Sequence, residues 1–157
     1  MNILVIYESK YGNTQKIAQA IAMSLRGYGT VQAMTADQAD AFSLVNADDL
    51  DLVFAGCPTQ IHKMTSAMRK FLDKIPNDAL RGLPAVTFDT RYDSPGWMSG
   101  TAARGIAREL YDKGAYVAAK PESFLVTEGG GSLQSGELDR AADWAQTVVE
   151  RLVVPLV

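Results

Sequence analysis

The strongest indication of the fold is a stretch near the N-terminus that reads Asn2-Ile3-Leu4-Val5-Ile6-Tyr7, followed by Ser9-Lys10-Tyr11-Gly12-Asn13-Thr14. Its first part is an apolar run typical of a buried parallel strand. Its second part places hydroxyl, glycine and amide groups directly before an amphipathic helix, whose apolar stripe is Ile17, Ile21 and Leu25. Backbone N–H groups and the partial positive charge of a helix N-terminus meet at such a loop, which predicts a phosphate site without a lysine clamp. An ordinary turn with a helix cap is the alternative, because turns favour the same residue types.

The composition indicates one globular domain over residues 1–157, with 47% hydrophobic and 21% charged residues and a net charge of −3. No basic stripe suggests a nucleic-acid partner. No apolar run is long enough to cross a membrane and no leader precedes the first strand, so we expect a cytoplasmic protein. A single cysteine, Cys57, and a single histidine, His62, argue against an internal disulfide and a zinc site.

Strand-like and helix-like segments alternate along the rest of the chain. Four further apolar runs predict strands: Val31–Met34, Leu52–Ala55, Ala85–Phe88 and Phe124–Val126. Apolar positions at helical spacing predict helices over Met64–Ile75, Ala103–Leu110 and Gly136–Leu152, with Ser135 as an N-cap and Gly114 just past a C-terminus, and Thr35–Asp48 allows only a short helix. We therefore predict an α/β fold: a three-layer, doubly wound, five-stranded parallel sheet in the order 2-1-3-4-5. Ligands of such sheets lie at the strands' carboxyl ends, here between strands 1 and 3.

Two more loops follow predicted strands at that same edge. The loop Gly56–Lys63 contains Cys57, which we interpret as a small packing residue because no basic neighbour in sequence would lower its pKa. After its first residue, the loop Phe88–Trp97 concentrates two aromatic side chains, Tyr92 and Trp97, with two carboxylates and an arginine. A plain surface loop is the alternative, but it would expose much aromatic area without a purpose.

The first loop resembles the phosphate loop of flavodoxins, Thr/Ser-x-Thr-Gly-Asn-Thr, and departs from it only where Tyr11 replaces a threonine. Element order and length are similar to the short-chain kind over nearly the whole chain. The resemblance implies FMN as cofactor, with the 5′-phosphate on the first loop and the ring between the other two. The cofactor-binding residues that it implies are Ser9, Lys10, Tyr11, Gly12, Asn13, Thr14, Pro58, Thr59, Gln60, Ile61, Phe88, Asp89, Thr90, Arg91, Tyr92 and Trp97.

The resemblance also shows where this chain departs from the family. An aromatic residue expected in the second loop is absent, so Ile61 or His62 would contact the ring, although His62 also fits a solvated loop imidazole. Either Tyr92 or Trp97 would pack on the outer face of the ring, and Asp89 and Thr90 would bond its pyrimidine edge. Arg91 would favour negative charge on the flavin, or it would pair with Asp89 or Asp93.

The function that the resemblance implies is electron transfer through bound FMN between redox partner proteins, a reductase and an acceptor, by a monomer or weak dimer. No residue is predicted to act as a catalytic acid, base or nucleophile. Two alternatives remain open: an FMN-dependent NAD(P)H/quinone-type oxidoreductase, and a flavodoxin-like binding domain without redox activity. A receiver domain and a low-molecular-weight phosphatase are excluded, because the first loop has neither paired acidic residues nor a cysteine.

Overall fold

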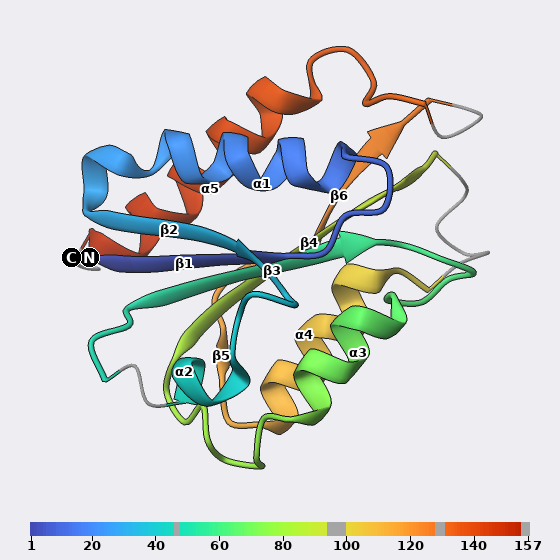
Figure 1. The fold of residues 1–157 in the computed structure, drawn as a ribbon. Coiled ribbons are helices and arrows are strands. Elements are labelled where there is room, and N and C mark those ends of the chain that lie inside the picture. Colours follow the sequence, from blue (N-terminus) through green and yellow to red (C-terminus); the bar gives the residue numbers. More distant parts are fainter. Residues whose placement is uncertain (46–47, 94–99, 128–130, 155–157) are drawn as a thin grey trace.

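A computed structural model describes residues 1–45, 48–93, 100–127 and 131–154. All strands lie in one parallel sheet with helices on both faces (Figure 1). The strands are β1 (Asn2–Tyr7), β2 (Thr30–Thr35), β3 (Leu52–Pro58), β4 (Pro84–Tyr92), β5 (Tyr116–Val117) and β6 (Glu122–Val126). The helices are α1 (Asn13–Ser24), the 3-10 helix η1 (Arg26–Tyr28), α2 (Ala41–Val45), α3 (Ser66–Asp73), α4 (Ala102–Asp112) and α5 (Glu137–Val153).

The strand order is β2-β1-β3-β4, and both β5 and β6 pair with β4 in parallel. The predicted order 2-1-3-4-5 is therefore confirmed, with two short strands sharing its last position. Pro121 lies between them and has no N–H group to give to the ladder, which explains the break. The sequence pattern missed β5 because two residues are too short to show a period.

The sheet separates two apolar cores (Figure 1). On one face, α1 and α5 bury Ile17, Ile21 and Val149 against Phe54 and Phe88. On the other face, α3 and α4 bury their own apolar stripes, which include Met68, Leu72, Ile106 and Leu110. Burial of a side chain of this size contributes about 1.5–3 kcal/mol, so the two cores hold the carboxyl ends of the central strands in fixed positions.

Two helix ends differ in how well they match expectation. Gly114 follows the C-cap of α4 with a φ of 98°, as predicted for a glycine just past a helix. Ser135 is not the N-cap of α5, because Gly136 takes that position with a φ of 85° and no side-chain cap. Glu137 in the first turn of α5 ties the helix to β6, because its Oε2 accepts the N–H of Leu125 at 2.7 Å.

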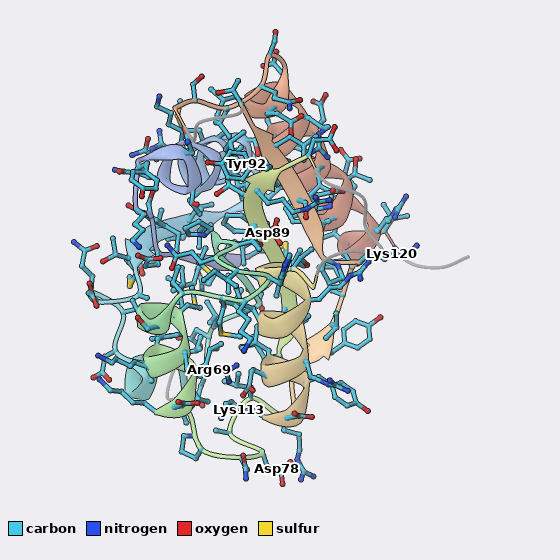
Figure 2. All side chains as sticks on the ribbon, turned by 90° about the vertical axis from the view of Figure 1, so that its right-hand side faces the viewer. Arg69, Asp78, Asp89, Tyr92, Lys113 and Lys120 are labelled. Carbon is cyan, nitrogen blue, oxygen red and sulfur yellow. The ribbon has the colours of Figure 1, made fainter. Side chains whose placement is uncertain are left out.

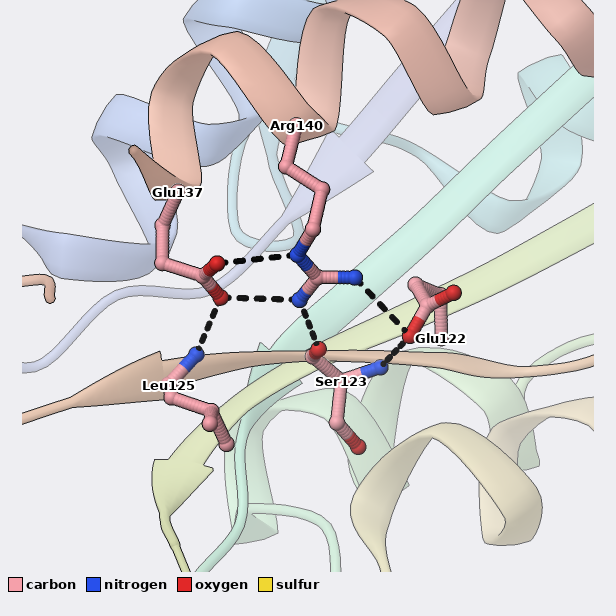
Figure 3. Close-up of polar contacts among 5 residues, drawn as sticks. All are labelled: Glu122, Ser123, Leu125, Glu137 and Arg140. Atoms are coloured by element: carbon pink, nitrogen blue, oxygen red, sulfur yellow. Dashed lines mark hydrogen bonds and ion pairs between the residues drawn. The ribbon is translucent and has the colours of Figure 1, made fainter. Parts of the chain in front are cut away.

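An ion-pair network joins α5 to β6 (Figure 3). Arg140 donates from Nε and Nη2 to the two carboxylate oxygens of Glu137, each at 2.8 Å, and also bonds the backbone carbonyl of Ser123. Its Nη1 lies 3.3 Å from a carboxylate oxygen of Glu122. The guanidinium also stacks 4.5 Å from the centre of the Phe124 ring. These contacts tie the start of the last helix to the strand that ends at the functional edge.

This network makes stability depend on pH. Bonding to Arg140 lowers the pKa of Glu137, so the ionised carboxylate stabilises the folded state above its unfolded pKa, and that stabilisation is lost as pH falls through the lower folded pKa. We expect Glu137→Gln to lower the free energy of unfolding by about 1–3 kcal/mol at pH 7. This range allows for the weakening of the ion pair by solvent, because Arg140 is partly exposed. Urea unfolding should show that the difference in free energy of unfolding between wild type and variant shrinks in acid. A difference that does not change with pH would contradict this prediction.

Candidate functional site

The first loop of the site contains Gly12, whose backbone conformation favours glycine. Gly12 has a φ of 90°, and a Cβ added there would meet nothing within 4 Å, so its backbone faces open space. Ser9 Oγ accepts the N–H groups of Gly12 and Gln15 at 3.1 and 3.2 Å. The loop is thus pinned by Ser9 while its outer side stays open to a ligand.

The start of α1 leaves donors at this open side. Asn13 and Thr14 are buried in the first turn, where backbone N–H groups have no partner within the helix. Among the described residues, no oxygen accepts a hydrogen bond from the backbone N–H of Asn13 or of Thr14. The Thr14 hydroxyl lies 2.7 Å from that of Thr90 on β4 and links the helix to the strand. Two free amides at a helix N-terminus suit one phosphate group.

The three loops meet around a small cavity at the carboxyl edge of the sheet. Figure 2 looks onto this edge, with Asp89 near the centre of the view and Tyr92 above it. The cavity has a volume of about 80 Å³ and is lined by Lys10, Tyr11, Asn13, Thr14, Pro58, Thr59, Gln60, Thr90, Arg91, Tyr92 and Val126. Sites that enclose a drug-sized ligand measure about 300–1,000 Å³, so this cavity is smaller than a site that encloses such a ligand.

The other predicted residues lie outside the lining. Ser9 holds the first loop by accepting the N–H of Gly12, and Ile61 is 89% exposed. Phe88 is fully buried in the core against Phe124, because even positions of β4 face α1 and α5. Asp89 points to the opposite face, toward α4. Trp97 lies outside the described residues. Val126 is a lining residue that the sequence did not suggest, although it ends a strand at the same edge.

The second loop is a tight reversal. Gln60 and Lys63 exchange backbone hydrogen bonds of 2.8 and 2.9 Å, and the two residues between them have positive φ angles, 47° for Ile61 and 66° for His62. A β-branched residue rarely adopts such a conformation. His62 is exposed at this tip, as expected for a solvated imidazole.

The third loop continues β4. Tyr92 is 49% exposed and lines the cavity, which keeps it a candidate for packing on a ring. Arg91 lines the cavity too and donates from Nη1 to the Tyr92 carbonyl at 3.0 Å. Burial raises the pKa of Asp89, and the charge of Arg91 offsets only part of that rise. Arg91 thus lies at the cavity, and its effect on a bound flavin or its pairing with Asp89 or Asp93 stays a prediction.

The N-terminus of α4 is satisfied by side chains of this edge. Thr59 Oγ1 accepts the N–H of Ala102 at 2.9 Å, and Asp89 Oδ2 accepts the N–H of Ala103 at 3.0 Å. Thr101 caps the helix by accepting the N–H of Arg104. This helix end is thus occupied within the chain, whereas the start of α1 has no side-chain cap.

Cys57 is buried, and desolvation raises the pKa of its thiol to about 12. Its role as a packing residue is therefore confirmed, since a thiol of this kind is unreactive. The described parts of the chain contain no cluster of His, Cys, Asp or Glu side chains able to hold a metal ion.

A larger cavity of about 500 Å³ lies under α2, on the face of β1 and β2. Its lining is mainly aliphatic, with Leu4, Ile6, Met34, Leu44 and Leu50, and it lies away from the three loops. The smaller cavity is therefore the candidate functional site, because the loop amides and a helix N-terminus converge there.

The residues at the carboxyl edge fit FMN. The open backbone at Gly12 and the two amides that follow provide a cradle for a phosphate, and Pro58–Gln60 and Thr90–Tyr92 border the adjacent space. FMN itself would supply the redox chemistry there. Fold and site together define a doubly wound α/β protein with an open loop and an uncapped helix N-terminus at its switch point.

Comparison with known proteins narrows this class. Residues 4–118 match the flavodoxin domain family. The chain is 23% identical to a flavodoxin of Clostridium saccharobutylicum over 97% of its own length and 98% of the relative's. It is 25% identical to an NAD(P)H dehydrogenase (quinone) of Solidesulfovibrio magneticus, over 95% of its own length and 84% of the relative's. A solved flavodoxin from the domain Archaea superposes with a TM-score of 0.78 at 21% identity, covering 97% of this chain and 99% of the other.

This chain belongs to the flavodoxin domain family, whose members are FMN-binding electron carriers. The structure describes no helix long and apolar enough to cross a membrane.

Proposed function

We propose that this protein, as a single domain, binds FMN at the cavity between the three loops and carries electrons between redox partner proteins. The observation that carries the proposal is the pair of unpartnered amides at Asn13 and Thr14 beside the open backbone of Gly12. The small cavity supports it, because a ring left open at one edge can pass electrons to a docked protein.

The chain's own residues hold and orient the cofactor in this proposal. The first loop binds the phosphate through backbone N–H groups, the side-chain amide of Asn13 and the hydroxyl of Thr14. Pro58, Thr59 and Gln60 border one side of the ring, and Thr90, Arg91 and Tyr92 border the other. The positive charge of Arg91 favours electron density on the flavin. Ser9, Lys10, Tyr11 and Ile61 complete the predicted surroundings, as supports or at the rim.

We expect Thr14→Ala or Asn13→Ala to weaken FMN binding by about 1–3 kcal/mol, or roughly 5- to 150-fold, because a phosphate hydrogen bond is lost. Riboflavin lacks the phosphate, so its affinity should stay nearly the same. Flavin fluorescence quenching measures both constants. Thr101→Ala is a matched control, since it removes a threonine cap from α4 instead. An equal loss of FMN and riboflavin affinity would show that this loop does not bind the phosphate.

The second candidate function is an FMN-dependent NAD(P)H/quinone-type oxidoreductase, favoured by the similarity to the Solidesulfovibrio magneticus protein. The two functions separate in one assay of the FMN-loaded protein. An electron carrier should oxidise NAD(P)H slowly with or without a quinone, and should accept electrons from a reductase protein. Rapid quinone-dependent oxidation of NAD(P)H would instead establish the second function.

The partners are proposed to be a reductase and an acceptor protein in the cytoplasm, with the chain acting as a monomer or weak dimer. A colourless purified protein that does not take up added FMN would overturn both redox functions and leave a binding domain.

A further inference from the structure

Asp89 is a buried carboxyl group that the proposed function does not yet use. It is 0% exposed, on β4, where the strand meets the candidate site. Its Oδ2 accepts the N–H of Ala103, while its Oδ1 has no hydrogen-bond partner among the described residues. Buried polar atoms are rarely left unpaired. Because Oδ1 has no hydrogen bond to lose, a proton can add to it without breaking an existing contact.

The groups around Asp89 come from every neighbouring element. Arg91 on β4 is the nearby cation, and Cys57 is its partner in register on β3. Glu8 follows β1, and its charge adds to the rise in the pKa of Cys57. Its buried Oε2 has no hydrogen-bond partner among the described residues. Hydroxyl groups of Ser123 and Thr59 approach the carboxyl and, with the amide of Ala103 and the charge of Arg91, lower its pKa. Desolvation is the largest effect, and the net result is a raised pKa.

Two residues connect Asp89 to the cavity. Thr59 lines the cavity, and its Oγ1 accepts the N–H of Ala102, so its own proton can point toward Asp89. Arg91 lines the cavity and acts on Asp89 by its charge. A negative charge that arises in the cavity would therefore compete with Asp89 for Arg91 and would repel the carboxylate.

We propose that Asp89 takes up a proton when FMN in this cavity is reduced, which couples electron uptake to proton uptake at a buried carboxyl. The proposal rests on the proposed function, because it requires FMN at this site. In the test, sodium dithionite would supply two electrons and be oxidised to sulfite. Bound FMN would take these electrons with one proton from water, which adds one negative charge to the site, and Asp89 Oδ1 would take a second proton from water. No bond of the protein other than this O–H bond forms.

The two-electron midpoint potential of the FMN-loaded protein, measured across pH, tests this coupling. Where Asp89 is ionised beside oxidised FMN and protonated beside reduced FMN, the potential should fall more steeply with pH. One additional proton for two electrons adds about 30 mV for each tenfold change in proton concentration. Asp89→Asn keeps an oxygen for the N–H of Ala103 but cannot take up the proton, so it should lose this additional slope. Asp93→Asn removes an exposed carboxyl from the same loop and should retain it.

A second measurement needs no variant. The reduced-minus-oxidised infrared spectrum of the FMN-loaded wild type should gain a carboxylic-acid band that shifts when aspartate is labelled with carbon-13. FMN affinity, measured first, separates the two ways to fail. A wild type that does not bind FMN overturns the proposed function and this inference together. Bound FMN with an unshifted infrared band, or with a slope that Asp89→Asn leaves unchanged, overturns this inference alone.

Discussion

Phe124→Ala should lower the free energy of unfolding by about 3–5 kcal/mol, the usual cost of deleting a buried aromatic ring. Phe124 is fully buried on β6, with ring centres 5.7 Å from Trp144 and 6.5 Å from Phe88 in edge-to-face arrangements. Arg140 stacks on the same ring. Removing the ring leaves a cavity and takes away these pair interactions at once.

Phe124→Leu is the matched variant, because it keeps most of the apolar volume and loses only the aromatic contacts. We expect it to cost clearly less than the alanine variant. Urea unfolding followed by circular dichroism gives both values. A loss below about 1 kcal/mol for Phe124→Ala would mean that the core repacks and that β6 is not held by this ring.

Gly56→Ala should cost about 2–4 kcal/mol, at the upper end of what overpacking a core usually costs. Gly56 lies in the middle of the sheet on β3, and a Cβ there would come within 2.4 Å of the Phe88 ring. That ring is fully buried and packs against Phe124. The position therefore requires glycine for close packing, and its substitution should also disturb the start of the second loop.

Two variants test this explanation for Gly56. Gly27→Ala adds the same methyl group where nothing lies within 4 Å, so its stability should stay close to that of the wild type. Replacing Phe88 by leucine in the Gly56→Ala background should restore part of the lost stability, because the clash is with the ring. If the two substitutions simply add, the contact between Gly56 and Phe88 is not the cause.

Much of the fold could be predicted because its signals are local. The apolar runs at Ile3–Tyr7 and Leu52–Ala55 mark strands buried on both faces, and helical periodicity marks the helices between them. The short pair Tyr116–Val117 and the Gly136 cap could not be predicted, since neither two residues nor one turn carries a period.

The candidate site divides in the same way. The residues of the first loop are consecutive, so their convergence on one point follows from the chain itself. In β4, alternate side chains face opposite sides of the sheet. Consecutive sequence therefore suggested Phe88 and Asp89 as ring contacts, whereas the strand directs one into the core and the other toward α4.

The fold class and the strand order could be read from the amino-acid sequence, because they depend on local pattern and on residues adjacent in the chain. Only the tertiary structure decided which side chains meet at the site. The Thr14–Thr90 contact joins residues 76 positions apart, and the unpaired oxygen of Asp89 results from how β3, β4 and α4 pack together. Contacts of this kind depend on strand register and facing, which fix where distant side chains lie.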